Sequence, residues 1–175
     1  NNMKEPWSDV NVRLAINYAI NRQQISDIGY EGANYPIVLP FSAYMAPNWV
    51  PGKIQELLDK YDRGTPDPAK VEEYMTKAGY AKNADGKWAK DGEVLKVPVF
   101  GPAFFQPSFP IVNQNLIDAG FESTVEVAAT DPEWVDKFLP GNHDTLILVH
   151  CGSLSEPFDT LKDLHTKFTA PIGTN

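Results

Sequence analysis

Apolar residues recur at helical spacing near the start of the chain. They are separated by three or four residues and so share one helix face: Val12, Ala15, Ile16, Ala19 and Ile20. Asp9 or Ser8 stands just before this series, and the side-chain oxygen of either residue can accept a hydrogen bond from the first helical turn. The pattern predicts a capped amphipathic helix within residues 7–25.

A second helix is predicted after Asp67, an N-cap residue that is followed by Pro68 at the first helical position. Gly79 is expected to end this helix. A shorter helix is expected over residues 52–61. Residues 30–51 contain several prolines and aromatic residues but no period, which predicts a long, ordered, proline-rich loop.

The second half of the chain alternates between strand and helix patterns. The expected strands cover 94–100, 122–129 and 144–150. The expected helices cover about 106–119, 131–139 and 157–167. Alternation of this length is typical of crossovers in a largely parallel sheet. The sequence therefore predicts an α/β fold with a mostly parallel sheet flanked by helices, in which a helical and loop half (1–80) precedes a strand–helix half (81–175).

Two further signals refine this prediction. Asp85-Gly86 and Asp91-Gly92 are turn dipeptides between short strands, one of which contains Trp88. The run from Thr145 to Val149 is almost continuously apolar, which is typical of a buried central strand.

Composition narrows the function classes. The chain has 175 residues and a net charge of −8, so a nucleic-acid partner is not expected, because phosphate binding needs clustered Lys and Arg. Cys151 is the single cysteine, which excludes a disulfide within the chain. No apolar run approaches the roughly 18 residues that a membrane-spanning helix needs.

The order of residues from Trp7 to Ile25 is close to D-x-x-V-R-x-A-I-x-Y-A-I-D-R-x-x-I, with Asn21 in place of the second Asp. This order resembles the signature helix of the family 5 extracellular solute-binding proteins, receptors that deliver peptides, nickel or oligosaccharides to ABC importers. Residues 67–80 resemble a second motif of that family, D-P-x-K-A-x-x-L-L-x-x-A-G-Y.

The resemblance implies that residues 1–175 are one lobe, the C-terminal one, excised from a larger bilobal receptor. The ligand would lie in a cleft between this lobe and the missing N-terminal lobe, and hinge closure would present both lobes to an ABC permease in the membrane. Such a receptor is extracytoplasmic, either periplasmic or lipid-anchored on the outer face of the cell membrane. It is not an enzyme, and it needs no catalytic residue, metal or cofactor.

Ligands of open α/β sheets bind outside the carboxyl ends of the strands, so the loops that leave those ends are the candidate site. The loop after residue 149 provides backbone access, hydroxyl groups and an apolar contact through His150, Gly152, Ser153, Leu154 and Ser155. Trp49 and Tyr44 are further candidates as faces on which a ligand stacks, and Phe104 and Phe105 belong to the same class of loop aromatics. The loop after residue 149 also has a purely structural interpretation, in which Ser155 or Glu156 caps the last helix.

Peptide-binding members of the family carry an Asp soon after this strand, which pairs with the free amine of the peptide. The resemblance places Ser153 at that position, and a serine cannot supply the charge. We therefore expect a neutral ligand, an oligosaccharide, with an oligopeptide or a nickel complex as the alternative.

Two other functions are less consistent with the sequence. Cys151 follows His150, but adjacent strand residues point to opposite faces, so a buried inert thiol is expected rather than a cysteine-dependent enzyme. The three histidines and one cysteine lack the compact spacing of a metal site. Arg13 and Arg22 are expected to form structural ion pairs with Asp9 or Asp27. Tyr18 and the tryptophans other than Trp49 are expected to pack in the interior: Trp7, Trp88 and Trp134.

Overall fold

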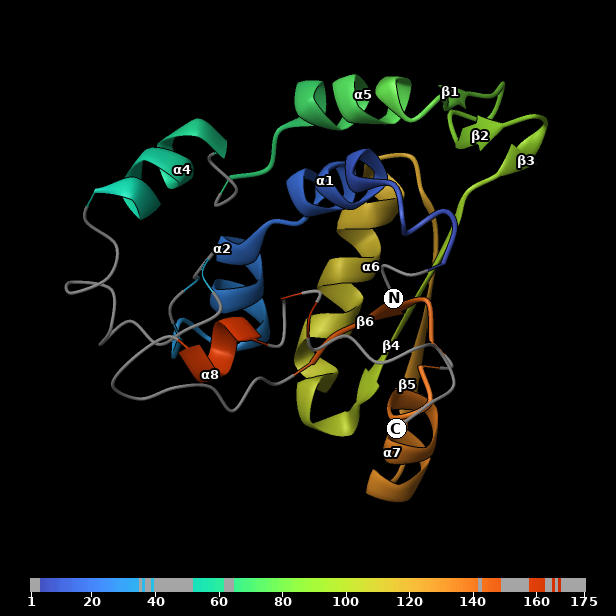
Figure 1. Ribbon diagram of the computed structural model, residues 1–175. Coiled ribbons are helices and arrows are strands. Elements are labelled where there is room, and N and C mark those ends of the chain that lie inside the picture. Colours follow the sequence, from blue (N-terminus) through green and yellow to red (C-terminus); the bar gives the residue numbers. More distant parts are fainter. Residues whose placement is uncertain are drawn as a thin grey trace.

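The computed structural model describes residues 4–34, 36, 39, 52–61, 65–141, 143–148, 158–162, 165 and 167. Its first part is helical (Figure 1). The helices of this part are α1 (Val10–Ala19), α2 (Arg22–Gln24), the π-helical turn η1 (Ile25–Gly29), α4 (Lys53–Tyr61) and α5 (Pro68–Lys77). The predicted loop over residues 30–51 falls largely outside the described residues.

Strands and helices alternate in the second part. A small antiparallel sheet contains β1 (Ala81–Lys82), β2 (Trp88–Lys90) and β3 (Glu93–Val94). The elements that follow are β4 (Lys96–Pro102), the 3-10 turn η2 (Ala103–Ser108), α6 (Phe109–Asp118), β5 (Glu122–Ala128), α7 (Asp131–Phe138), β6 (Thr145–Leu146) and α8 (Phe158–Leu161). The α/β class predicted from the sequence is confirmed.

The main sheet has the order β5-β4-β6, and both pairs are parallel. β4 pairs with β5 along its whole length, from Lys96 opposite Glu122 to Pro102 opposite Ala128. In the described part of the chain β4 is therefore the central strand, whereas the apolar run after Asp144 had predicted that role for β6. β6 borders β4 alone in this part of the structure, which is why its residues are only half-buried.

Helices cover both faces of β4 (Figure 1). Successive strand residues point to opposite faces, so Val97 and Val99 face α6 and join Phe109, Val112 and Leu116 in the core. Phe100 faces the other way and meets the ring of Trp134 on α7, with 5.8 Å between the ring centroids. Burial of both faces holds β4 in place.

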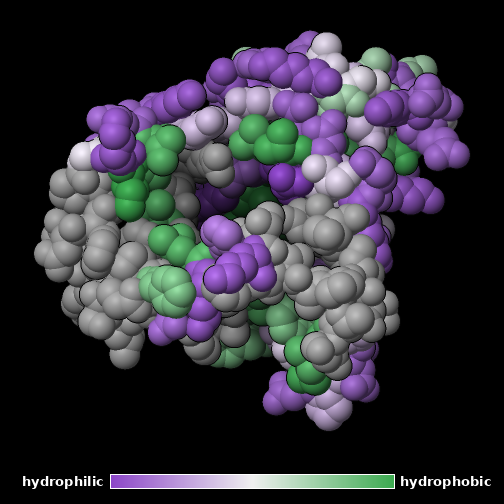
Figure 2. Space-filling view, in the orientation of Figure 1, coloured by the Kyte–Doolittle hydropathy of each residue, from purple (hydrophilic) through white to green (hydrophobic). Residues whose placement is uncertain are grey.

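α1 and α5 lie side by side next to one end of α6 (Figure 1). The rings of Tyr18 and Tyr74 stack with centroids 5.8 Å apart, and the backbone N–H of Asp67 donates to the carbonyl of Tyr18. Tyr18 is buried, as expected, and so are Trp7 and Trp88, while Trp134 is half-buried and stacks on Phe138. Hydrophilic side chains gather along the outer margin formed by α5 and β1–β3 (Figure 2).

The predicted first helix is interrupted. Asp9 caps it as expected, but α1 ends at Ala19, and Ile20 adopts an extended backbone conformation. Asn21 then caps α2, while its own N–H donates to Oδ1 of Asn115 on α6 at 2.7 Å. A hydrogen bond to a residue distant in sequence thus satisfies the backbone N–H at the break. The periodicity of residues 7–25 could not reveal this break, because the break depends on that distant contact.

Arg13 does not form the predicted ion pair with Asp9. Its Nη1 donates to the backbone carbonyls of Trp7 and Ser8, at 2.5 and 2.9 Å. Arg22 donates from Nη2 to Oδ1 of Asn17 at 2.6 Å. Both arginine side chains thus stabilise the local structure, as expected. Arg13 does so by donating hydrogen bonds to carbonyl oxygens rather than by pairing with a carboxylate.

The Asp-Gly turns behave as predicted. Asp91 and Gly92 both have positive φ, 53° and 85°, and form the two-residue connection between β2 and β3. Gly86 has a φ of 74° between β1 and β2. Within the described residues, none of the helices is both long and apolar enough to cross a bilayer.

Gly101 determines how closely the end of β4 approaches its neighbours. A Cβ at this position would lie 2.8 Å from the backbone oxygen of Ile147 and 2.8 Å from Cζ of Phe109. Real Cβ atoms do not approach backbone oxygens so closely, so only glycine fits between the chain after β6 and the start of α6.

We expect Gly101→Val to lower the free energy of unfolding by about 1–3 kcal/mol, because the added atoms overpack a site with no free space. Urea denaturation measures this change. Ala129→Val, at an exposed position beyond β5, is the control and should change stability by less than about 0.5 kcal/mol. Equal stability of the two variants would contradict the close approach at Gly101.

Asp67→Ala should lower stability by about 1 kcal/mol, because the Asp67 carboxylate accepts hydrogen bonds from the N–H groups of Ala69 and Lys70 in the first turn of α5. Thermal unfolding followed by circular dichroism tests this expectation. Asp136→Ala on the exposed side of α7 removes the same charge without removing a cap, and should leave the midpoint nearly unchanged.

Candidate functional site

Parallel strands bring their carboxyl ends to one edge of the main sheet. Three chain segments leave this edge: residues 103–108 after β4, residues 129–130 after β5, and residues 147–148 after β6. The N–H of Ile147 donates to the carbonyl of Phe100 at 2.9 Å, which fixes the third segment against the first. This carboxyl edge is the position at which open α/β sheets bind ligands.

Phe104 is the most exposed large apolar side chain at the carboxyl edge. It is 76% exposed and lies directly after β4 on η2. The ring of Phe105 meets it edge to face with centroids 4.9 Å apart, so the exposed ring is supported from behind. Leu148, on the segment after β6, is a second exposed apolar side chain, at 43%. The edge therefore presents an aromatic and aliphatic surface to solvent.

Two reciprocal hydrogen bonds between side chains and the backbone stabilise the turn between β5 and α7. Oγ1 of Thr130 accepts a hydrogen bond from the N–H of Glu133, and Oε2 of Glu133 accepts one from the N–H of Ala129 at 2.8 Å. The Glu133 carboxylate is thereby engaged with the backbone. A rigid, hydrogen-bonded turn thus forms this part of the edge.

The site residues predicted from the sequence cannot be placed in this geometry. All seven lie outside the described residues: Tyr44, Trp49, His150, Gly152, Ser153, Leu154 and Ser155. Cys151 also lies outside them. Phe104 and Phe105, which the sequence indicated as loop aromatics, are described and lie at the expected edge.

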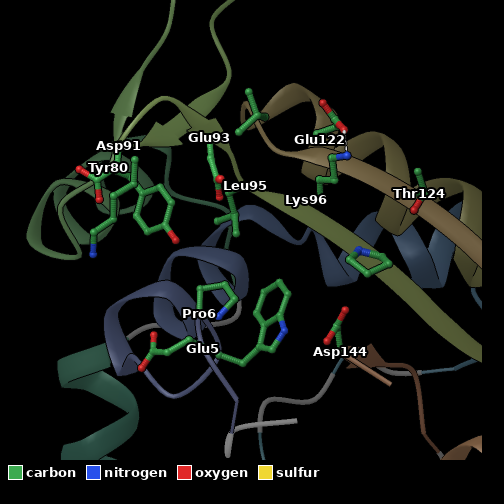
Figure 3. A pocket seen from close by; sticks show the side chains of 14 residues that line it. Glu5, Pro6, Tyr80, Asp91, Glu93, Leu95, Lys96, Glu122, Thr124 and Asp144 are labelled. Atoms are coloured by element: carbon green, nitrogen blue, oxygen red, sulfur yellow. Dashed lines mark ion pairs between the residues drawn. The ribbon is translucent and has the colours of Figure 1, made fainter. Parts of the chain in front are cut away.

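A large groove lies at the opposite, amino edge of the sheet (Figure 3). Its volume is about 910 Å³. Figure 3 shows Glu93, Leu95 and Lys96 on one wall, with Glu5, Pro6 and Asp144 across from them. Tyr80 and Asp91 lie at one side of the groove.

The lining of this amino-edge groove is rich in carboxylates. It contains Glu5, Asp91, Glu93, Glu122 and Asp144, against the two lysines Lys90 and Lys96. Lys96 forms an ion pair with Glu122 at 3.8 Å, which the solvent weakens because both side chains are exposed. Burial, followed by the nearby carboxylates of Glu5 and Asp9, raises the pKa of Tyr80.

Sequence reasoning missed the amino-edge groove because it concentrated on the carboxyl ends of the strands. A signal was nevertheless present, since acidic residues begin or precede three of the strands: Glu93 at β3, Glu122 at β5 and Asp144 before β6. Parallel pairing brings the last two to the same edge of the sheet.

Among the described residues, no three or more His, Cys, Asp or Glu side chains are grouped so that they could hold a metal ion. His143 packs against the ring of Phe138, with centroids 6.0 Å apart, and burial lowers its pKa. Its Nδ1 is buried and has no hydrogen-bond partner within the described part of the chain. This histidine thus packs against α7.

The chain is similar to bacterial peptide-binding proteins. Di/tripeptide-binding protein 1 from Pseudomonas aeruginosa is 26% identical over 166 residues, covering 92% of this chain and 27% of that protein. The chain thus spans about a quarter of the length of this relative.

Solved structures share the fold. DppA from Helicobacter pylori in complex with the peptide STSA superposes with a TM-score of 0.71 at 22% identity, over 92% of this chain and 28% of that chain. A mannohexaose-bound periplasmic oligopeptide-binding protein from Thermotoga maritima gives a TM-score of 0.68 at 24% identity, over 83% and 28% of the two chains.

The family model of the middle part of the bacterial extracellular solute-binding proteins, family 5, matches residues 1–170. The match covers both sequence motifs and almost the whole α/β structure described above. The chain therefore belongs to the family 5 bacterial extracellular solute-binding proteins.

Proposed function

We propose that this chain is one lobe of the solute-binding receptor of an ABC uptake system. The receptor binds its solute in a cleft formed by the carboxyl edge of the sheet and a second lobe. Closure of the two lobes presents the loaded receptor to a permease in the membrane. The protein is extracytoplasmic, periplasmic or lipid-anchored on the outer face of the cell membrane, and the family consists of binding proteins rather than enzymes.

The single observation that carries the proposal is the exposed Phe104 ring at the carboxyl edge. An aromatic ring that is 76% exposed and supported by Phe105 loses little conformational freedom when a ligand covers it. Ligand pockets are mostly apolar, with a few polar groups that fix orientation. The carboxyl edge therefore suits a ligand that stacks on the ring of Phe104.

We propose an oligosaccharide as the solute. The C–H face of a sugar ring matches an aromatic face, and the described exits at the carboxyl edge carry few charged groups. Glu133 is engaged with the backbone, and Asp131 lies in the first turn of α7. The Thermotoga maritima protein, which shares this fold, is bound to mannohexaose, and this supports the proposal.

The alternative is an oligopeptide or a nickel complex. The Pseudomonas aeruginosa relative is named for di- and tripeptides, and the Helicobacter pylori protein is in complex with a peptide. A free peptide amine binds most strongly to an acidic partner, through a charge-assisted hydrogen bond. Ser153 at the family's Asp position favours the neutral ligand, and we propose it as a contact together with His150, Gly152, Leu154, Ser155, Trp49 and Tyr44.

Calorimetry of the intact receptor against manno- and cello-oligosaccharides, a peptide panel and a nickel–histidine complex tests the ligand class. We expect an oligosaccharide to bind about a hundredfold more tightly than any peptide or nickel complex. Tight binding of a peptide with no measurable sugar binding would contradict the oligosaccharide proposal while leaving the receptor role intact.

Phe104→Ala in the intact receptor should weaken binding of the preferred ligand by about fivefold to tenfold, because it removes a stacking face worth roughly 1 kcal/mol. Leu57→Ala on α4 is the matched control, since that side chain is also exposed (53%) but lies away from the carboxyl edge. Fluorescence titration of both variants gives the ratio, and an unchanged affinity in Phe104→Ala would remove this residue from the site.

A further inference from the structure

The segment that carries Phe104 is in contact with the first half of the chain. η2 leads from the end of β4 to the start of α6, and Phe104 is its second residue. The hydroxyl of Tyr30 lies 2.9 Å from Oγ of Ser108, the last residue of η2. Tyr30 stands 78 positions before Ser108 and directly follows η1. This hydrogen bond therefore joins the end of η1 to a segment of the carboxyl edge.

The hydroxyl of Ser108 is not used by the helix that it precedes. A serine just before a helix ordinarily caps the first turn, but Ser108 makes no capping hydrogen bond to α6. The second residue of α6 is Pro110, which has no N–H to donate. Ser108 is only 6% exposed, and a buried hydroxyl without a partner is costly. The contact with Tyr30 thus satisfies a buried group that α6 leaves available.

Tyr30 is itself held in place by its backbone. Its N–H donates to the carbonyl of Ser26 at 3.2 Å, and its carbonyl accepts from the N–H of Ala33 at 2.8 Å. The carbonyl of Ser26 also accepts from the N–H of Gly32, and Oγ of Ser26 donates to the carbonyl of Asn34 at 2.6 Å. Ser26 is buried, so the turn after η1 is anchored in the interior. The hydroxyl of Tyr30 is therefore a fixed point for η2.

A second contact brings η1 close to the junction of η2 and α6. A Cβ at Gly29 would lie 3.1 Å from the carbonyl oxygen of Pro107 and 3.2 Å from Cδ1 of Ile111. Both distances are shorter than ordinary Cβ contacts, so glycine at this position allows the approach. η1 is a π-helical turn, a form that is rare in proteins and frequent at functional sites.

η2 needs support at both ends. It is a six-residue 3-10 turn, and 3-10 hydrogen bonds have poorer geometry than those of an α-helix. Phe105 interrupts it further, with a non-helical φ of −99° and ψ of 15°. Its conformation therefore depends on neighbouring contacts. β4 holds one end, and Tyr30 binds the other end at Ser108.

We propose that Tyr30 is a positioning residue for solute binding, which acts through Ser108 to hold η2 in the conformation that presents the ring of Phe104. This inference rests on the proposed role of Phe104 in the solute cleft. The effect of Tyr30 on the solute is indirect, because it raises the fraction of receptor molecules in which the ring is ready to stack. Apparent affinity falls in proportion to that fraction.

Hydrogen exchange of the intact, solute-free receptor tests the positioning step. Tyr30→Phe removes the hydroxyl alone, and amide exchange at residues 103–106 should become about threefold faster. Ser108→Ala should give the same acceleration, and the double variant no more than either alone, because all three lack the same hydrogen bond. Exchange at residues 97–100 of β4 should not change, which separates a local effect from a general loss of stability.

Tyr80→Phe is the matched control, since it removes the same hydroxyl group near the opposite end of β4. It should leave exchange at residues 103–106 unchanged. Unchanged exchange at these residues in both Tyr30→Phe and Ser108→Ala would overturn the proposal, whichever solute the receptor binds.

Stopped-flow binding tests the consequence for the solute. The probe is mannohexaose, or the ligand that calorimetry finds to bind most tightly. Tyr30→Phe should lower the association rate constant by about threefold and leave the dissociation rate constant unchanged, because fewer receptors are competent but the bound state keeps its contacts. Phe104→Ala should instead mainly raise the dissociation rate constant, since it removes a contact with the solute.

The two variants combined give the sharpest outcome. In the Phe104→Ala background, Tyr30→Phe should change affinity by less than about 1.5-fold, because no ring is left to position. The same threefold loss in both backgrounds would overturn the proposal, since Tyr30 would then act on the solute by another route. Affinity unchanged by Phe104→Ala alone would count against the proposed function, while the solute-free exchange would still decide whether Tyr30 positions η2.

Discussion

Burial of β4 on both faces is the constraint on which the rest of this structure depends. Val97 and Val99 form one face against α6, and Phe100 forms the other against Trp134 of α7. The same strand pairs with β5 and β6, so it fixes the position of both neighbours. At its end, Gly101 has no side chain and allows the segment after β6 and the start of α6 to close over the strand. The two edges of the sheet acquire their positions from this one strand.

Those two edges differ in chemistry. The described part of the carboxyl edge presents Phe104 supported by Phe105, with Glu133 engaged by the backbone. The amino edge presents an acidic groove over a floor that includes Trp7. The two surfaces lie at opposite ends of β4.

Local signals in the sequence predicted most elements, although β6 covers only Thr145–Leu146 of the strand expected over 144–150. Asp9 and Asp67 cap helices as expected, Asp91-Gly92 forms the two-residue turn, and the alternating half gives the parallel pairs. What the sequence could not show depends on distant residues. The break after Ala19 is stabilised by Asn115, 94 positions beyond Asn21 along the chain, and Arg13 finds carbonyl oxygens rather than a carboxylate. The acidic groove likewise combines residues from the N-terminal turn, β3, β5 and the segment before β6, and the predicted ligand loop at 150–155 lies outside the described residues.

Hydrogen exchange of the intact receptor, with and without its solute, tests most directly whether the carboxyl edge is the ligand edge. Solute binding should slow amide exchange at residues 103–105, 129–130 and 147–148, and should leave residues 91–96 at the amino-edge groove unchanged. Protection confined to residues 91–96, with none at the carboxyl edge, would contradict the account, because it would place the solute at the opposite end of β4.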